Sequence, residues 1–384
     1  MKKKKLIMII LIIIMCPILL CGCWDYEEID SLAIVSGIAV DKDKISNKYT
    51  VTAEIITTQM QGSSSIISSE LYVSEGESVF SAVRNMIQKT GLKLFWSDAK
   101  VLIVSESLAT EGVIPVIDWL NRSSDVRPDM WFLISKGETA AEILKCKVKL
   151  NEVVSFHLND TMHSGIILSK YTFSNLWSFI DRLTAEGNSQ AVATVKNELN
   201  DSTIAPRLSG SAIFKSDKLV GYLDGNETLF MLMLRNNIKD GLITFKNVSG
   251  TNTNVTLELY ENTTKLTPHY NNGSASLIID IYPIISIAEV QGTENFIEDK
   301  NLKIFQNEAE NNMKVQIQSL ISKLQKYDTD ILDFGEIFQK EKPKISKNLK
   351  RSGINIFPNI KTEVNVHLDI KSSGRMNNSI PIAK

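Results

Sequence analysis

The chain has 384 residues, of which 43% are hydrophobic and 22% are charged, so it is long enough for two or three domains with their own cores. Its 42 Lys and Arg against 44 Asp and Glu give a net charge of −2, and no basic stripe with interleaved aromatic residues argues for nucleic-acid binding. Four cysteines in so long a chain argue against a disulfide-built scaffold.

The first residues have the layout of a secretory signal peptide. A basic segment, Met1 to Lys5, precedes the apolar run from Leu6 to Leu20. A transmembrane helix needs about 20 apolar residues, and Pro17 interrupts this shorter run near its end. We therefore predict a cleaved signal peptide over residues 1–22, with an uncleaved membrane anchor as the alternative. Losing Lys2 to Lys5 with it takes the net charge to about −6.

A pair of cysteines follows the apolar run in the sequence "LCGC", which has the order of a bacterial lipobox. Small residues before Cys23 let the chain lie extended in a peptidase cleft, and the Cys23 thiol can take a diacylglyceryl group. Cys21 fills a position that is usually held by a small aliphatic or hydroxyl residue. With Cys16 and Cys21 removed and Cys23 acylated, Cys146 has no partner and is expected to be a partly buried free thiol.

The next part of the chain predicts a mixed α/β domain over residues 24–187. The β-branched runs "LAIVSGIAV" and "YTVTAEIITTQ" predict paired strands, and the Ser-rich "QGSSSIISSE" predicts a loop. In "ESVFSAVRNMIQKTG", Val79, Val83 and Met86 recur at helical spacing, and Gly91 supplies a stop. Strand, helix, strand and short helix follow in "AKVLIVS", "EGVIPVIDWLNRSS", "DMWFLIS" and "TAAEILK".

A polar, weakly periodic segment at 188–207 predicts a linker. After it, "SAIFK" and "LVGYL" flank a Ser-Asp-Lys turn and predict a hairpin. A helix containing Thr228 to Asn236 and the alternating strand "NVTLELYE" complete a small middle domain over 208–270. The chain is expected to turn again at "TPHYNNGSAS".

The remaining residues, 271–384, predict a C-terminal α/β domain. Its first strand, "SLIIDIYPIISIAEV", contains Pro283, which indicates an edge position or a bend. The strand "EVNVHLDIK" alternates strictly. Between these strands lies a long helix with one apolar stripe, which predicts packing on a sheet: Leu302, Phe305, Ala309, Met313, Ile317, Leu320 and Leu324. The expected fold class is α+β, with three mixed α/β domains and largely antiparallel sheets.

The sequence carries no recognisable catalytic or metal motif. The segment "HLNDTMH" groups His157, Asp160 and His163 at a spacing that matches no zinc motif, and positions six apart lie on different helix faces. No Gly-x-Ser-x-Gly elbow, phosphate loop or GxGxxG is present. We expect no catalytic residue, no cofactor and no metal. The alternatives are a solute-binding lipoprotein of a transporter, which would need two similar lobes with parallel sheets, and a lipid-tethered cell-wall enzyme.

The opening "CWDYEEIDSLAIVSGIAVDKD" closely resembles the start of the mature Ger(x)C spore-germination lipoproteins. The matching residues are Cys23, Trp24, Asp25, Glu28, Ile29, Gly37, Ile38, Val40 and Asp41. Further blocks resemble the family in the expected order. They are carried by Phe95, Lys100, Leu108, Ala109, Gly112, Asp118, Arg122 and Arg127; by Gly210, Ala212, Phe214, Lys218, Leu219, Gly221, Leu223 and Glu227; and by Asp330, Phe334 and Gly335. The chain departs from the family at Ser97-Asp98, where a Ser-His pair is common.

This resemblance implies a lipoprotein on the outer face of the spore inner membrane, held there through acylated Cys23. It also implies assembly with two integral-membrane subunits, of the A and B types, into a receptor that senses small nutrients. In such a receptor we expect this subunit to act through contacts, without catalysis and without a direct small-molecule ligand.

Overall fold

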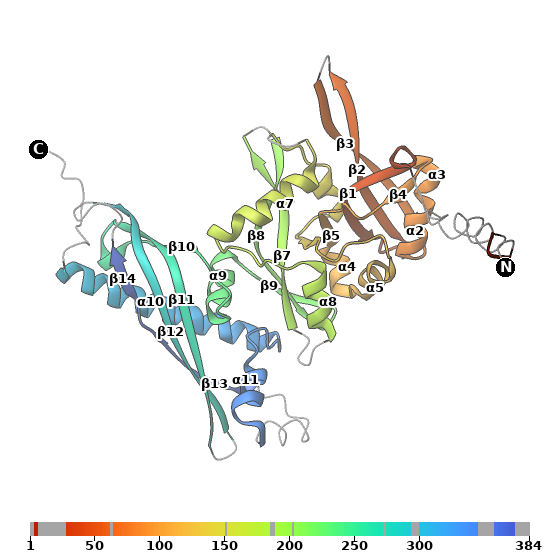
Figure 1. Ribbon diagram of the computed structural model, residues 1–384. Coiled ribbons are helices and arrows are strands. Elements are labelled where there is room, and N and C mark those ends of the chain that lie inside the picture. Colours follow the sequence, from red (N-terminus) through yellow and green to blue (C-terminus); the bar gives the residue numbers. More distant parts are fainter. Residues whose placement is uncertain are drawn as a thin grey trace, which may run out of the picture.

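The computed structural model is an elongated protein built on two β-sheets, with the N-terminal half of the chain on the right and the C-terminal half on the left in Figure 1. The structure describes residues 4–6, 28–61, 64–149, 152–184, 189–201, 203–271, 274–292, 299–344 and 357–372. The α+β class is confirmed, since the chain mixes helices with two mixed sheets. The expectation of largely antiparallel sheets is wrong, because six of the twelve strand pairings in the described structure are parallel.

The larger sheet has nine strands in the order β3-β2-β1-β5-β6-β7-β8-β9, with β4 beside β1. Its ends are antiparallel hairpins, and its centre, from β1 through β5 and β6 to β7, is parallel. The strands are β1 (Leu32–Lys42), β2 (Tyr49–Gln61), β3 (Ser64–Gly76), β4 (Lys93–Phe95), β5 (Val101–Ser105), β6 (Trp131–Ser135), β7 (Ser189–Asn200), β8 (Thr203–Lys215) and β9 (Lys218–Leu223).

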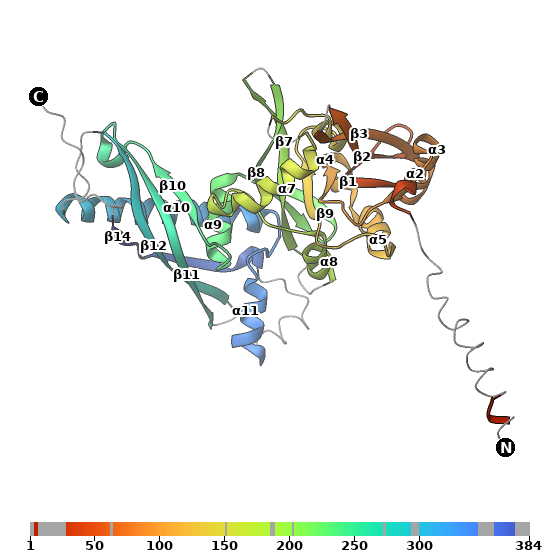
Figure 2. The same ribbon diagram turned by 45° about the horizontal axis from the view of Figure 1, so that its top comes forward.

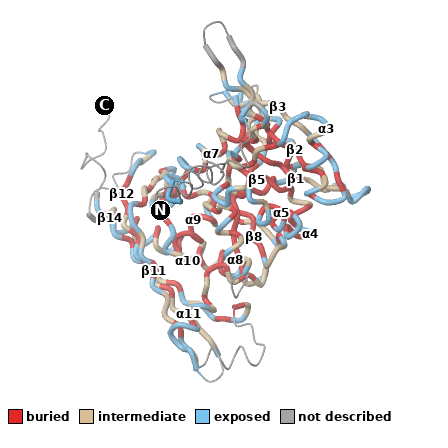
Figure 3. The backbone as a smooth tube through the Cα atoms, turned by 45° about the vertical axis from the view of Figure 1, so that its right-hand side comes forward, coloured by how far each residue is buried: buried red, intermediate tan, exposed pale blue. Residues whose placement is uncertain are grey.

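Helices cover both faces of this sheet, because both faces of its central strands are apolar. One face packs against α2 (Val79–Asn85), α4 (Glu106–Glu111), α5 (Ile114–Arg122) and α8 (Leu176–Thr184). The other packs against α6 (Ala140–Leu144) and α7 (Val154–Ser164). The short α3 (Ile87–Thr90) ends at Gly91, whose φ of 69° is left-handed, as expected for this stop signal. In Figure 3 the buried residues concentrate along the central strands.

The smaller sheet has five strands, in the order β10-β11-β12-β13 with β14 also beside β12. The strands are β10 (Gly241–Phe245), β11 (Asn254–Asn271), β12 (Ser274–Gln291), β13 (Lys361–Val366) and β14 (Asp369–Ser372). The helices of this part of the chain are α9 (Gly225–Leu234), α10 (Asp299–Lys326) and α11 (Phe334–Glu341). Single 3-10 turns lie at Ile29–Ser31, Gly165–Ile167, Val248–Gly250 and Phe357–Asn359.

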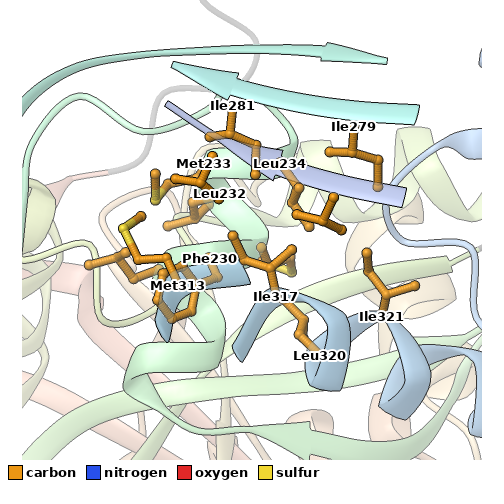
Figure 4. Close-up of a cluster of buried hydrophobic side chains, with 14 of the residues drawn as sticks. Phe230, Leu232, Met233, Leu234, Ile279, Ile281, Met313, Ile317, Leu320 and Ile321 are labelled. Atoms are coloured by element: carbon orange, nitrogen blue, oxygen red, sulfur yellow. The ribbon is translucent and has the colours of Figure 1, made fainter. Parts of the chain in front are cut away.

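The long helix packs on the smaller sheet as its apolar stripe predicts. Every member of that stripe lies in the core of this sheet, with Leu302 partly buried at its margin. Figure 4 shows Met313 and Ile317 of α10 meeting Phe230 of α9 below Ile281 of β12. Since α9 also packs against strands of the larger sheet, one continuous hydrophobic core joins the two sheets.

The domain boundaries expected from the sequence differ from the division between the sheets. The predicted linker at 188–207 is wrong, because β7 occupies most of it and lies inside the larger sheet. The predicted middle domain at 208–270 is divided between the two sheets. β8 and β9 complete the larger sheet, whereas β10 and β11 begin the smaller one. The C-terminal unit expected over 271–384 begins inside the β11–β12 hairpin.

Two local predictions are corrected by the pairing of strands. The Ser-rich segment expected to be a loop forms the start of β3. Pro283 lies in an interior strand, β12, and not at an edge. It is tolerated there because the neighbouring strand changes at this point: Ile281 pairs with the end of β13, and Ile284 pairs with the start of β14. The missing N–H of the proline therefore falls at the gap between β13 and β14.

Candidate functional site

The predicted lipid site, Cys23, and the signal peptide before it lie outside the described residues, apart from 4–6. The continuous description begins at Glu28, four residues before β1. In the described part of the chain, no helix combines the length and apolar character needed to cross a membrane.

The histidines do not form a shared site. On α7, His157 is half-buried, and burial lowers its pKa, whereas His163 is exposed and lies edge-on to Trp131 with ring centroids 5.4 Å apart. His367, at the edge of the smaller sheet, stacks on Tyr282 with a centroid distance of 4.9 Å. No group of three or more His, Cys, Asp or Glu within the described ranges could hold a metal ion.

Cys146 is a half-buried free thiol, as the sequence predicts. Its Sγ lies 2.8 Å from Oδ1 of Asn197, and burial together with Glu138 and Glu142 raises its pKa to about 11. We expect it to react with a thiol-specific reagent at pH 8 at least roughly a hundredfold more slowly than in the unfolded chain, because the thiolate is the nucleophile. The measurement is the rate of chromophoric disulfide exchange with and without urea, and equal rates would contradict this prediction.

A buried carboxylate of β2 positions helix α7 beside Gly37 of the opening sequence block. Glu54 of β2 is 1% exposed, and its Oε1 and Oε2 accept the N–H groups of Val154 and Ser155 at 2.8 and 2.9 Å. The hydroxyls of Ser155 and Ser69 also donate to this carboxylate. A Cβ atom at Gly37 would lie 1.8 Å from Oγ of Ser155, so the glycine permits this close approach of α7 to β1.

A carboxylate of the opening block itself holds the preceding helix, α6. Asp41, at the end of β1, accepts the N–H groups of Ala140 and Ala141 at 2.8 and 3.0 Å, and so satisfies donors at the start of α6. Burial raises the pKa of Asp41, and the two backbone hydrogen bonds oppose that rise. The residues Gly37 and Asp41, which carry much of the family resemblance, therefore have structural roles in fixing helices on the sheet.

The junction between the two sheets contains a partly buried ion cluster around Asp333. Arg182 at the end of α8 donates two hydrogen bonds to its carboxylate, at 2.9 and 2.8 Å, in a bidentate arrangement. Arg235, after α9, lies 3.5 Å from the same carboxylate, and its pKa is lowered by burial and by Arg182. This cluster links α8 of the larger sheet to the start of α11.

Two ion pairs and one ring contact connect the segment around β9 with the end of α10 and the turn after it. Lys323 of α10 pairs with Glu227 of α9 at 2.7 Å, and Lys215 of β8 pairs with Asp328. The ring of Tyr327 lies over Gly221 of β9, where a Cβ atom would meet it at 2.3 Å. Sequence reasoning missed this junction because its partners are about a hundred residues apart and no local pattern connects them.

Asp330 holds the start of α11 at this junction. Its two carboxylate oxygens accept the N–H groups of Phe334 and Gly335 at 2.9 and 2.6 Å. Burial raises its pKa to about 6, and the two backbone hydrogen bonds only partly offset that effect. The Asp-x-x-x-Phe-Gly block is thus a helix start whose carboxylate lies inside the junction.

This raised pKa predicts a pH dependence of stability. Because the folded pKa of about 6 exceeds the ordinary 3.8, the folded protein binds this proton more tightly than the unfolded chain. The contribution of Asp330 is full below 3.8 and is lost as the pH rises through 6. Relative to Asp330→Asn, we expect the protein to gain about 1 kcal/mol in the free energy of unfolding between pH 7 and pH 5. Urea unfolding of both proteins at both pH values measures this. An equal change in the free energy of unfolding of the parent and of Asp330→Asn would refute it.

The arrangement described so far defines a two-sheet α+β protein, whose helix starts are fixed by carboxylates and whose sheets meet at an ion-paired junction. Comparison with known proteins identifies the family to which the chain belongs. Residues 25–196 match the family described as "Spore germination protein N-terminal domain", and residues 209–374 match "Spore germination B3/ GerAC like, C-terminal". The chain belongs to the Ger(x)C family of spore germination proteins, the C subunits of germinant receptors.

Individual relatives agree over nearly the whole length. The chain is 23% identical to spore germination protein KC of Bacillus subtilis (strain 168), covering 99% of this chain and 98% of that protein. It is 25% identical to spore germination protein B3 of the same organism, covering 81% and 83%. The crystal structure of the GerBC protein superposes with a TM-score of 0.54 at 19% identity, covering 90% of this chain and 99% of that one, which shows a shared fold.

Proposed function

We propose that this protein is the lipid-anchored C subunit of a nutrient germinant receptor on the outer face of the spore inner membrane. The observation that carries the proposal is the pair of family matches over residues 25–374, which begins two residues after the lipobox cysteine, Cys23. In the proposal, Cys23 carries the lipid, and A-type and B-type integral-membrane subunits are the partners.

We further propose that the subunit acts through contacts and not through chemistry. Its buried carboxylates are engaged with backbone N–H groups: Glu54 with α7, Asp41 with α6 and Asp330 with α11. Groups engaged in this way hold the starts of helices, which supports a structural role for them in the proposal. Confinement to a membrane surface raises the local concentration of binding surfaces, so weak contacts with membrane partners are sufficient.

Spore germination in a defined nutrient tests the function. A strain lacking the protein should fail to respond to the nutrient, and should still germinate when triggered downstream of the receptor. The catalytic alternative is tested with alanine replacements of His157, Asp160, His163, His269 and His367, which should each leave the response intact. A normally abundant histidine variant that fails completely would support an enzyme or a metal site instead.

A thermal-shift panel of nutrients tests the remaining alternative, a solute-binding lipoprotein. A ligand at a hundred times its dissociation constant stabilises a protein by about 2.7 kcal/mol. We expect no shift from the purified protein, because nutrient recognition is assigned to the assembled receptor. A concentration-dependent rise in melting temperature with one nutrient would favour the transporter reading.

A further inference from the structure

The β2–β3 hairpin extends far beyond the body of the larger sheet, at the top of Figure 1. We call the part from Ile55 to Ser69 the arm. The arm contains no charged residue and no proline, although 22% of the whole chain is charged. Beyond Ile55, its described side chains are exposed or only partly buried, and Ile67 is 54% exposed. The described part of the arm is therefore an uncharged pair of strands in contact with solvent.

The outer edge of the arm is formed by β3, which is the last strand of the sheet. Nearer the body, this edge is covered by side chains: Lys89 donates to the carbonyl of Val73 at 2.6 Å, and Asn85 donates to that of Glu75 at 2.9 Å. Pairing with β2 is regular along the whole of β3. Since strand geometry repeats every two residues, the backbone groups of Ile67, Ser69 and Leu71 also face outward.

The other end strands of the two sheets are protected in ways that β3 is not. In the larger sheet, β9 is short and packs against α4. In the smaller sheet, β10 has five residues, and β13 with β14 carries charged residues such as Lys361, Glu363 and Asp369. Short strands, charges and covering helices are the usual protections against edge-to-edge pairing. The outer part of β3 is long and has no covering helix, and up to Ser69 it carries no charge; Glu70 is the first charged residue along it.

Unprotected edges of this composition pair readily with another strand. Low charge and absence of proline are features of segments that add to a sheet, and Ile66 and Ile67 supply β-branched side chains on this edge. A lipid surface is a poor occupant, because open backbone N–H and C=O groups are not tolerated in hydrocarbon. A highly charged strand is also disfavoured, since apart from Glu70 its charges would lie opposite Ser, Ile and Leu without counter-charges.

The position of the arm relates it to the membrane. β1 runs antiparallel to β2 with Val35 opposite Ile55, so the arm leaves the sheet at the end where β1 begins. Twelve residues separate Val35 from Cys23 in the sequence, and an extended chain of that length spans at most about 40 Å. If Cys23 is acylated, the base of the arm lies within that distance of the bilayer.

We propose that the outer edge of β3, from Ile67 to Leu71, is a docking site for an uncharged extended segment of an integral-membrane partner, which adds to the sheet as a further strand. Main-chain hydrogen bonds to Ile67, Ser69 and Leu71 provide the affinity, as in other cases of strand addition. The proposal rests on the proposed function for the presence of a membrane partner, and on the described structure for the edge itself.

Photo-cross-linking in spore membranes tests the site with the full-length protein. A benzophenone amino acid replaces Ile67, and the matched control replaces Val315, which is 64% exposed on α10. We expect at least tenfold more adduct with an integral-membrane protein from position 67 than from position 315. Adducts with lipid alone, with a second copy of this chain alone, or at the control level would each overturn the proposal.

A pair of substitutions separates strand addition from side-chain contact. Ile67→Pro removes an outward N–H and leaves the β2–β3 hydrogen bonds in place, whereas Ile67→Thr keeps the N–H and removes apolar bulk. We expect the proline to lower the amount of partner that co-purifies at least tenfold, and the threonine to stay within about twofold of the parent. Equal losses would indicate a side-chain contact and contradict strand addition.

Two controls keep the result interpretable. First, the unfolding midpoint of each variant is measured. If the proline lowers that midpoint, Ile67→Lys, which adds a charge to the arm, is used in its place. The same tenfold loss of co-purifying partner is expected from it. The germination assay separates the two proposals. A protein that is needed for nutrient germination and yet gives no adduct at position 67 refutes the docking site alone, whereas a dispensable protein refutes the function.

Discussion

Replacing Glu54 with alanine should lower the free energy of unfolding by about 3 kcal/mol, the largest stability effect that we expect from one side chain. The carboxylate is buried and accepts the N–H groups of Val154 and Ser155. Its removal leaves these buried donors at the start of α7 without an acceptor, and each such loss costs roughly 1 to 3 kcal/mol. It also leaves the hydroxyls of Ser36 and Ser69 without this partner.

Equilibrium urea unfolding of the protein without its signal peptide measures this effect. All five tryptophans lie before residue 188, so their fluorescence reports the part of the chain that contains Glu54. Glu54→Gln, which keeps one oxygen acceptor, should fall between the parent and the alanine variant. The matched control is Glu70→Ala on the neighbouring strand, where the side chain is exposed and a change within about 0.5 kcal/mol is expected. Equal effects at both positions would contradict the capping role.

Replacing Cys23 with alanine should reduce germination in a defined nutrient at least tenfold at equal protein level, the largest functional effect that we expect. A diacylglyceryl thioether supplies two acyl chains, which anchor a protein stably, whereas a single myristoyl chain is marginal. Without the anchor, the protein loses the confinement that makes weak contacts with membrane partners effective.

Metabolic labelling with a palmitate analogue checks the chemistry in the same strains. Label should be absent from the Cys23→Ala variant and retained by Cys21→Ala, which replaces the neighbouring cysteine with the small residue that a lipobox usually has at that position. Persistent label in Cys23→Ala would place the lipid elsewhere. Loss of label with normal germination would refute the need for the anchor.

Patterns that are local in the sequence predicted much of the fold. The periodicity of α10 predicted its buried stripe, and Gly91 predicted the end of α3. The hairpins β1–β2 and β8–β9 were also predicted, because a strand pair joined by a short polar turn is visible within about thirty residues. In each case the interacting residues are near neighbours in the chain, so their spacing carries the information.

Predictions failed where polar composition hid a strand. The start of β3 and most of β7 were expected to be a loop and a linker. In β7, the apolar run from Ala191 to Val195 is short and buried on both faces, and the polar residues after it belong to the outer part of a hairpin. Such strands are stabilised by neighbours on both sides, which the segment itself does not reveal.

By itself, the sequence determined the α+β class, the long amphipathic helix and, through the order of its blocks along the chain, the resemblance that the family matches confirm. Only the tertiary structure decided which strands join which sheet, what Glu54 and Asp330 bind, and that β3 has an open edge. The physical reason is that these features depend on contacts between residues far apart in the chain. Glu54 and Val154 are 100 residues apart in the chain, and Arg182 and Asp333 are 151 apart, so no local pattern connects either pair.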